Sequence, residues 1–390
     1  MKITNNKILI FISFLYFLLA YKRPYKTVID GVEMTFISSM LITEDTNIDE
    51  GEFISNNLYD INILVVDGAT LTITPGRNIS KIVSKSIMRN LLQENTVNFQ
   101  ETNDYKFGLT STIVAIAAKV NINGATIYVD SDYSNAIMAF NGATVTIKNS
   151  IIITKSNYSK GIVSSYNSYV DLKDDTKFYT YGFFSPCLEI NKNKGQIIGS
   201  SLYLYSEGEG SPLIKGLGDG IITLISASGN ANHSQILIIQ GNNEVSLNLC
   251  EFICNGQGYN NTGETVNESN NIKNGGIVLH YKEEPDNNLA NLYFFDCKIR
   301  IDNEENIDIP MFSCYDIIAD VILSNTEANF KDKFMQASTT NSNINTLISL
   351  EINDKGFIGK INAEEGTKIT LKIDQNLLSQ IEINENVDVI

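Results

Sequence analysis

Acidic side chains are the first residues of this 390-residue chain that could carry out chemistry. Asp174 and Asp175 form its only adjacent pair of aspartates, and enzymatic cleavage of a glycosidic bond ordinarily uses two carboxyl groups. The pair follows a strand-like stretch, at a place where polar residues ordinarily form a corner. We therefore interpret Asp174 and Asp175 as corner residues and assign no catalytic residue.

Metal chemistry has few residues to work with. The chain has two histidines and no Cys-x-x-Cys, so neither a histidine-dependent triad nor a structural zinc site is predicted. Asp130 with Asp132, or Glu207 with Glu209, would supply the oxygen ligands that calcium prefers, but short acidic stretches are usually solvated. We predict no cofactor, with calcium as the one left open.

Tyrosine is the aromatic residue that could bind a ligand, because the chain contains 18 tyrosines and no tryptophan. A local group consists of Tyr158, Tyr166, Tyr169, Tyr179 and Tyr181. Alternation along the strand-like stretch Phe178–Phe183 places Tyr179 and Tyr181 on the face opposite Phe178. We expect this exposed pair to be the ligand-binding residues, with a sugar stacking on the rings; plain surface decoration is the alternative.

The charge of the chain restricts its partners. A net charge of -16 and a pI near 4.6 leave no basic surface for a nucleic acid backbone, so no nucleic acid partner is predicted. The same charge argues against a polyanionic substrate, unless a local Lys/Arg cluster or calcium supplies positive charge. Neutral glycans or proteins fit better as partners.

A repeat of about 25 residues supplies the elements that position these side chains. Three series of apolar residues keep this step. The first is Ile113, Ile137, Ile162, Cys187, Leu213 and Ile236; the second is Ile122, Ile147, Leu172, Ile198, Leu224 and Leu247; the third is Ile127, Ile152, Phe178 and Leu204. Because the series lengthen and shorten together, they indicate successive coils of one solenoid.

Each apolar strip is predicted to be a strand, because its local period is two. In Ala143–Lys148, Val145 and Ile147 alternate with Thr144, Thr146 and Lys148, which points the first two inward. Corners such as Asp67-Gly68 and Asn141-Gly142 use residue types that tolerate φ above zero. We predict an all-β fold: a single-stranded right-handed parallel β-helix of about ten coils with three strands each.

Two insertions are predicted to leave the coils at corners. The first, near 79–102, places Ile79, Val83, Ile87 and Leu91 at helical spacing and is expected to be a short helix. The second, near 255–274, is polar and is expected to be a loop. The later coils are expected around Leu292–Cys297, Val321–Thr326 and Leu350–Leu371, with Ile381 and Ile383 closing the stack.

Five cysteines do not form a disulfide framework, given their odd number in a chain of this length. Cys250, Cys297, Thr326 and Ser150 fall at one coil position. This equivalence favours a stacked row of small buried residues over a thiol function.

The N-terminus has the layout of a secretory signal. Lys2 and Lys7 precede an apolar run from Ile8 to Ala20, which is short for a membrane span. We expect residues 1–20 to be a cleaved signal peptide, with a signal anchor as the alternative, residues 21–60 to be a lead-in or cap, and residues 61–390 to be the β-helix. The protein is therefore expected to be secreted or extracellular, at the cell surface in one alternative, and to contact a membrane only through an uncleaved N-terminal segment.

The chain resembles the secreted adhesin-like, autotransporter-passenger-like β-helix proteins of gut and rumen microbes. The matching stretches are 108–129 (GLTSTIVAIAAKVNINGATIYV), 136–154 (AIMAFNGATVTIKNSIIIT), 209–214 (EGSPLI) and 245–252 (VSLNLCEF), and weaker coils extend the resemblance over most of residues 60–375. It departs from that family in its N-terminal insertion, which is richer in Lys, Arg and apolar residues than the expected Gly/Ser/Asp loop. The resemblance implies the fold, a non-catalytic role in binding a glycan or protein ligand on flat faces, and no catalytic residues.

A carbohydrate-active enzyme is the alternative, because parallel β-helices also include polysaccharide lyases and glycoside hydrolases. Pectin hydrolases of this fold show paired Asp, a Gly-His-Gly and an Arg-Ile-Lys. In this chain neither His233 nor His280 has a glycine neighbour, and Arg300 lies in Ile-Arg-Ile. We therefore favour a binding protein over an enzyme.

Overall fold

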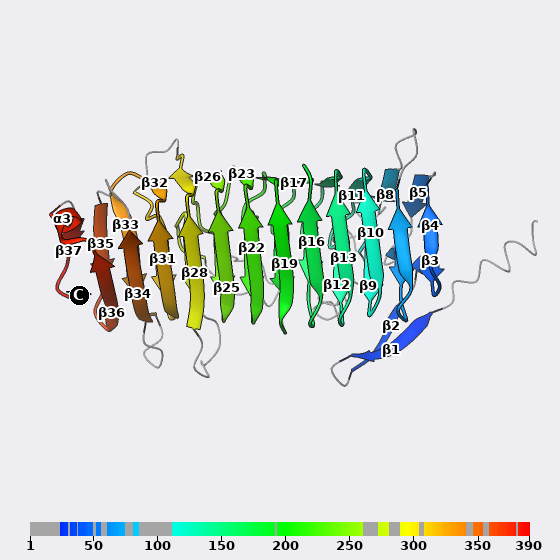
Figure 1. Ribbon diagram of the computed structural model, residues 1–390, viewed down its shortest axis with the longest axis horizontal. Helices are drawn as coiled ribbons and strands as arrows, with labels where there is room; N and C mark the ends of the chain where they lie inside the picture. The colour runs from blue at the N-terminus through cyan, green and yellow to red at the C-terminus, as the bar shows by residue number, and fades with distance from the viewer. Residues whose placement is uncertain are drawn as a thin grey trace, which may run out of the picture.

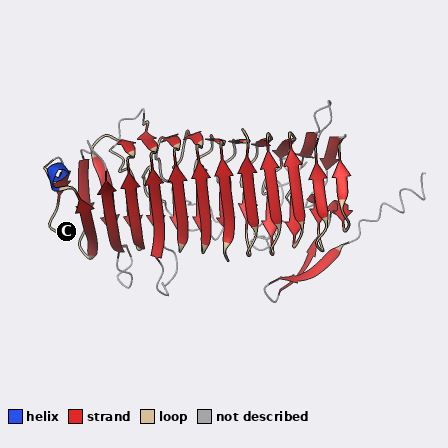
Figure 2. Ribbon diagram, in the orientation of Figure 1, coloured by secondary structure: helices blue, strands red, loops and turns tan. Residues whose placement is uncertain are grey.

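The structure is a computed structural model, and it shows a right-handed parallel β-helix (Figures 1 and 2). It describes residues 24–29, 32–36, 38–49, 52–55, 61–74, 81–85, 111–191, 193–259, 272–280, 289–303, 308–340, 346–353, 359–379 and 381–390. Ten coils contribute one strand to each of three parallel sheets, and the last coils contribute to two sheets only. The predicted fold class, coil length and three strands per coil are confirmed.

The three sheets are named here in the order in which each coil visits them. Sheet 1 contains β3 (Ser38–Ile42), β6 (Ile61–Val65), β9 (Ile113–Ile116), β12 (Ile137–Phe140), β15 (Ile162–Ser164), β18 (Leu188–Asn191), β21 (Ile214–Leu217), β24 (Leu237–Gln240), β27 (Ile277–His280), β30 (Phe312–Tyr315), β33 (Lys333–Ser338), β35 (Gly359–Ala363) and β37 (Ile381–Ile383). Sheet 2 contains β4 (Thr46–Ile48), β7 (Thr70–Ile73), β10 (Lys119–Asn123), β13 (Thr144–Lys148), β16 (Tyr169–Lys173), β19 (Gly195–Ser200), β22 (Gly220–Ile225), β25 (Asn243–Asn248), β28 (Leu289–Phe295), β31 (Ile318–Ser324), β34 (Thr346–Asn353), β36 (Thr367–Ile373) and β38 (Val387–Val389).

Sheet 3 is shorter and lies along the top of Figure 1. It contains β5 (Glu52–Ser55), β8 (Lys81–Lys85), β11 (Thr126–Asp130), β14 (Ile151–Thr154), β17 (Lys177–Thr180), β20 (Tyr203–Ser206), β23 (Ser228–Ala231), β26 (Glu251–Cys254), β29 (Lys298–Ile301) and β32 (Glu327–Asn329). Outside the three sheets, β1 (Tyr25–Ile29) and β2 (Val32–Phe36) form an antiparallel hairpin, and the helix α3 (Gln375–Leu378) lies near the C-terminus.

Strand alternation builds the core as the sequence predicts. Val145 and Ile147 in β13 are fully buried, whereas Thr144 and Thr146 are only half-buried. Ile147 pairs with its counterpart residues in the neighbouring coils, so that inward side chains stack in rows along the axis. One continuous apolar cluster therefore fills the helix along its length.

After Ile162, the residues that pair between coils differ by one position from the first predicted series. Ile162 pairs with Leu188 instead of the expected Cys187. The next partners are Ile214 and Leu237, in place of Leu213 and Ile236. The expected series is wrong there because Cys187 and Leu188 are both buried members of the core, so periodicity alone does not show which of them pairs with Ile162.

The second series contains one wrong residue. Leu172 pairs with Gly199 and not with Ile198. A Cβ atom at Gly199 would lie 2.5 Å from Leu202 Cδ1 and 2.8 Å from Leu224 Cδ2. Neighbouring leucines therefore fill the place of the missing side chain, which leaves a core position without an apolar residue for a pattern to detect.

The coils begin earlier than the sequence predicts. β3, β4 and β5 already pair with the next coil, so the helix starts at Ser38, inside the stretch expected to be a lead-in. The signal peptide predicted over 1–20 lies outside the described residues. Among the residues that the structure does describe, no helix is long and apolar enough to cross a membrane.

The first insertion begins later in the chain than predicted. Lys81–Lys85 forms β8, which pairs with β5 and β11. The predicted helix is therefore wrong at Val83, which lies in this strand, and residues 86–110 lie outside the described part of the chain. The helical spacing was misleading because Val83, a residue of this strand, lies four positions from Ile79 and from Ile87 in the sequence.

The second insertion departs at a corner, as expected. Between β26 and β27 the described ends of the long connection pair through Tyr259 and Ile272. Leu247 pairs with Phe294 in the next coil, which confirms that the 47-residue step is one coil with extra residues. Residues 281–288, which lie outside the described part of the chain, separate β27 from β28, so the extra residues belong to two corners.

Corners adopt the left-handed conformation that their residue types predicted. Asp67, Gly68, Asn141 and Gly142 all have positive φ.

The predicted row of small residues is also confirmed: the side chains of Ser150, Cys250, Cys297 and Thr326 each donate to the carbonyl oxygen two residues earlier. All five cysteines are buried and free.

A row of aromatic rings follows the corner between sheets 3 and 1. Tyr133 stacks on Tyr158 with ring centroids 4.7 Å apart, and Tyr158 stacks on Phe184 at 5.1 Å. The next corner carries Gly210, whose Cβ atom would lie 2.6 Å from the Phe184 ring. Tyr259, from the long connection after β26, contacts Phe184 there at 4.8 Å and so fixes this connection to an earlier coil.

Over the middle coils the outer face of sheet 1 is buried, unlike that of the other sheets. In β9, β12, β18, β27 and β30 every residue is buried. The outward residues near the N-terminal end form a second apolar cluster, to which Phe36 of β2 belongs. This outer cluster consists of Phe36, Ile61, Leu64, Val66, Val114, Ile116, Met138, Phe140 and Val163.

Candidate functional site

The outer face of sheet 3 presents two adjacent rows of side chains that cross the strands. The first row contains Thr126, Ile151, Lys177, Tyr203, Ser228, Glu251, Lys298 and Glu327. The second row contains Tyr128, Ile153, Tyr179, Tyr205, Asn230, Ile253, Arg300 and Asn329. Every one of these residues is half-buried or exposed, so the rows form an accessible surface.

Four tyrosines gather on two neighbouring coils of this face. We call Tyr179, Tyr181, Tyr203 and Tyr205 the tyrosine cluster. Its ring centroids lie 5.8 Å apart for Tyr179 and Tyr203, 6.1 Å for Tyr179 and Tyr205, and 5.9 Å for Tyr181 and Tyr205. The rings are tilted by 47–55°, so they do not cover one another and leave apolar surface for a ligand.

The two sequence-predicted residues have different surroundings. Both lie outward of Phe178, which is fully buried, as alternation predicts. Tyr181 is 36% exposed, but Lys155 Nζ lies 3.1 Å from the centroid of its ring. The ammonium group covers one face of Tyr181 by a cation–π contact, and burial lowers the pKa of Lys155, partly offset by Asp130. Tyr179 is half-buried, and its ring packs at an angle against the rings of Tyr203 and Tyr205.

A fixed carboxylate lies beside the rings. The Tyr205 hydroxyl donates to Glu207, and the Asn232 amide donates to Glu207 Oε2 at 2.8 Å and to the Tyr205 hydroxyl at 2.9 Å. His233 Nε2 lies 3.7 Å from the other oxygen, Glu207 Oε1. Burial, and then the hydrogen bond to Glu207, raise the pKa of Tyr205, so the phenol remains a donor at neutral pH.

This arrangement combines the kinds of group that recognise a neutral sugar. Aromatic rings provide flat apolar surface for the C–H face of a pyranose, while the preset carboxylate, amide and ammonium groups can accept from and donate to hydroxyl groups. Because Tyr205 and Asn232 already hold Glu207, binding orders few side chains and costs less entropy.

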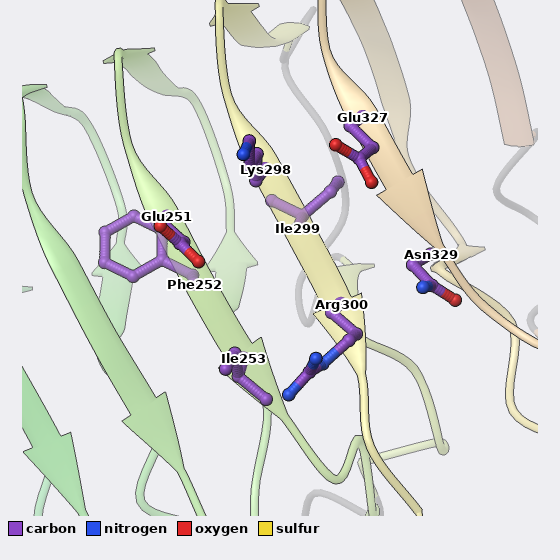
Figure 3. A pocket seen from close by; sticks show the side chains of 8 residues that line it. All are labelled: Glu251, Phe252, Ile253, Lys298, Ile299, Arg300, Glu327 and Asn329. Carbon is purple, nitrogen blue, oxygen red and sulfur yellow. The ribbon is translucent and has the colours of Figure 1, made fainter. Parts of the chain in front are cut away.

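A shallow hollow of about 200 Å³ lies further along the same face (Figure 3). Glu251, Lys298 and Glu327 line it from the first row, and Arg300 and Asn329 from the second. In Figure 3 the Arg300 side chain extends toward Ile253 of the neighbouring strand. Its guanidinium lies 3.3 Å from Asp302. The hollow thus places cations and carboxylates alternately.

The aspartates considered above as catalytic or calcium-binding candidates lie in a corner or accept hydrogen bonds from neighbouring residues. Asp174 and Asp175 lie in the corner between β16 and β17, both with positive φ. Asp130 accepts a hydrogen bond from Ser156 Oγ at 3.1 Å, and Asp132 accepts one from the backbone N–H of Asn157 at 2.9 Å. Within the described residues, no three His, Cys, Asp or Glu side chains gather in a way that could hold a metal ion.

One ion pair is buried outside the apolar core. Lys160 and Glu189 contact each other with side chains 5% and 0% exposed. Glu189 lies on the outer face of sheet 1, between Val163 and Lys215 in the strand register, and its Oε2 atom is buried without a hydrogen bond. The pair is enclosed and offers no surface to a ligand.

Sequence reasoning missed Tyr203, Tyr205, Glu207 and Asn232 as members of the site. The coil step contained the necessary signal, because Tyr205 follows Tyr179 by one coil and pairs with it. The hydrogen bonds of Glu207 depend on side-chain direction at the corner after β20, which periodicity does not describe. The charged hollow was missed because its residues come from three separate coils.

Comparisons with known proteins come back empty: no protein-family model, no curated protein and no solved structure matches this chain. The fold and the site described above therefore define the class, a parallel β-helix with an aromatic and polar outer face on one sheet.

Proposed function

We propose that the protein is a non-catalytic, secreted or cell-surface binding protein of the adhesin-like kind, whose ligand is a glycan bound on the outer face of sheet 3. The observation that supports this most directly is the tyrosine cluster beside the preset Glu207 carboxylate. Four rings and a fixed acceptor lie together on an accessible flat face. Such a face holds ligands by stacking and hydrogen bonds.

The location outside the cell is part of the same proposal. It draws on the N-terminal sequence and on the resemblance to secreted β-helix proteins. The net charge of -16 favours neutral glycans over acidic ones, because an anionic ligand would be repelled by the surface as a whole.

A glycan array with purified protein tests the proposal. Binding to a flat face is weak at each site and gains strength from multivalency, so protein clustered on beads should bind where single molecules wash off. Tyr179→Ala should reduce retention several-fold. Tyr169→Ala is the matched control, since Tyr169 is a half-buried tyrosine on the outer face of sheet 2. Equal retention of both variants would contradict the proposed site.

An assay of product release tests the absence of catalysis. We expect no reducing ends and no unsaturated products from neutral or acidic polysaccharides, with or without calcium. Steady turnover that disappears in Asp174→Ala or Asp175→Ala would favour an enzyme instead.

A further inference from the structure

We propose that one extended neutral glycan chain lies along the axis of the β-helix, across the strands of sheet 3, from the tyrosine cluster to the charged hollow. This inference rests on the proposed function and adds the direction, the length and a second subsite of the ligand. The two regions would otherwise be unrelated features of one face.

The strand register makes the two regions continuous. Tyr205 pairs with Asn230, Asn230 with Ile253, and Ile253 with Arg300. The second row therefore runs from the tyrosine cluster to the hollow with no corner or insertion between them. A ligand that follows this row crosses each strand once.

The strand between the two regions carries small or short outward side chains. β23 presents Ser228 in the first row and Asn230 in the second, and both are half-buried. Their neighbours on β20 are the larger Tyr203 and Tyr205. A chain that leaves the tyrosine rings can therefore stay close to the backbone of β23, where Ser and Asn offer both donors and acceptors.

The hollow contains the chemistry that sugar hydroxyl groups need. Glu251 and Glu327 flank Lys298 in the register, so acceptor, donor and acceptor follow one another at strand spacing. With Arg300 and Asp302 included, the carboxylates outnumber the cations. This balance favours a neutral chain over an acidic one, because an added anion would meet net negative charge.

The lengths of ligand and site agree. From β17 to β32 there are five strand spacings, about 24 Å in total. One sugar unit of an extended β-linked pyranose chain is similar in length to the strand spacing in a sheet, about 4.8 Å. Successive sugar units can therefore meet equivalent positions of successive coils, and a chain of about five or six units would cover both regions.

Chain-length dependence of binding tests this inference. The ligands are cellobiose and cellohexaose, with the xylan and mannan oligosaccharides of the same two lengths as parallel series, and the dissociation constants of the intact chain are measured by calorimetry. We expect the hexasaccharide of the series that binds to have at least about tenfold higher affinity than its disaccharide.

Two variants separate the regions. Tyr179→Ala should weaken both lengths, whereas Lys298→Ala should weaken the hexasaccharide roughly tenfold and leave the disaccharide unchanged. The control is Lys372→Ala, which removes an exposed lysine of sheet 2 that pairs with Glu351; it should change neither length. Thermal unfolding of all three variants should match the parent chain.

The outcomes distinguish this inference from the proposed function. An unchanged hexasaccharide affinity in Lys298→Ala, or equal affinities for the two lengths, would overturn the extended-chain inference while leaving glycan binding at the tyrosine cluster intact. Binding of a branched or terminal glycan on the array, with no binding of these linear chains, would do the same. Loss of all glycan binding would remove the proposed function itself.

Discussion

The outer faces of sheet 1 and sheet 3 are built from the same kind of strand but have opposite environments. On sheet 1 the outward residue Val163 is 1% exposed, whereas on sheet 3 the outward residue Ile151 is 39% exposed. Their inward neighbours are alike, since both sheets contribute to one core. Alternation therefore determines which residues fill the β-helix, but it does not determine which outer face can meet a ligand.

Two glutamates show the same contrast in charge. Glu189 on sheet 1 is fully buried and contacts Lys160, whereas Glu207, beside sheet 3, is held at the surface by Tyr205 and Asn232. A buried charge depends on its partner for stability, and an exposed one is solvated by water. The first glutamate is thus a structural group, and the second is available for binding.

The largest expected effect comes from placing a carboxylate on each outer face. Val163→Asp should prevent folding or cost about 4 kcal/mol or more, because the new charge would be buried without a partner. Ile151→Asp should cost less than about 1 kcal/mol, since its side chain already meets water. Chemical unfolding followed by circular dichroism measures both, and similar costs would show that the two faces do not differ.

Removing each glutamate should give the next largest difference. Glu189→Ala should cost about 3–5 kcal/mol, because it removes the buried carboxylate that the Lys160 ammonium group contacts. Glu207→Ala should cost less than about 1 kcal/mol, as is typical for groups at the surface. Denaturant midpoints provide the comparison, and Glu189→Gln, which keeps the shape but loses the charge, should fall between the two.

The inward faces of sheets 1 and 3 should behave alike, and the buried cysteines test this. Burial raises the pKa of Cys187, Cys254 and Cys314 to about 12 from a reference of 9.0, and Cys314 lies on sheet 1 while Cys254 lies on sheet 3. Between about pH 9 and 12 the unfolded chain loses these protons and the folded chain keeps them. Stability is therefore complete below about pH 9 and falls as the pH rises.

Each of these thiols should contribute a loss of up to about 1.4 kcal/mol per pH unit. Cys314→Ser and Cys254→Ser should flatten the decline in stability to a similar extent, as measured by urea unfolding at pH 8, 9 and 10. A flattening confined to one variant would show that the inward faces differ as well.

The smallest expected effect concerns the cation above Tyr181. Lys155→Met keeps the apolar length of the side chain but removes the ammonium group from the ring, and should cost about 0.5–1 kcal/mol. The measurement is thermal unfolding at low and high salt, and the difference from the parent chain should shrink as salt increases. An effect that is independent of salt would show that packing, not charge, holds this lysine.

The sequence predicts the inward positions well because one physical constraint repeats in every coil. Val145 and Ile147 are examples, and the corner at Asn141 follows from the same repetition. The buried outer face of sheet 1 also left a signal: the strand Ile137–Phe140 is apolar at every position, which is typical of strands buried on both sides.

Other features depend on contacts that no local pattern records. Gly199 occupies a core position only because two leucines from other positions fill its space. The hydrogen bond between Asn232 and Glu207 joins residues 25 apart; the coil step places them in neighbouring coils but does not show that their side chains meet. The candidate site was therefore predicted as two tyrosines, without the Glu207 carboxylate and the charged hollow that lie on the same face of sheet 3.

The contact between Tyr259 and Phe184 bears on how the rod responds to force. Coils that bond only to their neighbours would separate one at a time when a stacked rod is pulled from its ends. Tyr259 follows β26, yet its ring contacts Phe184, which follows β17. Pulling apart any coil between these two corners therefore also requires breaking this aromatic contact, so the middle of the rod should yield as one block and at a higher load than its ends.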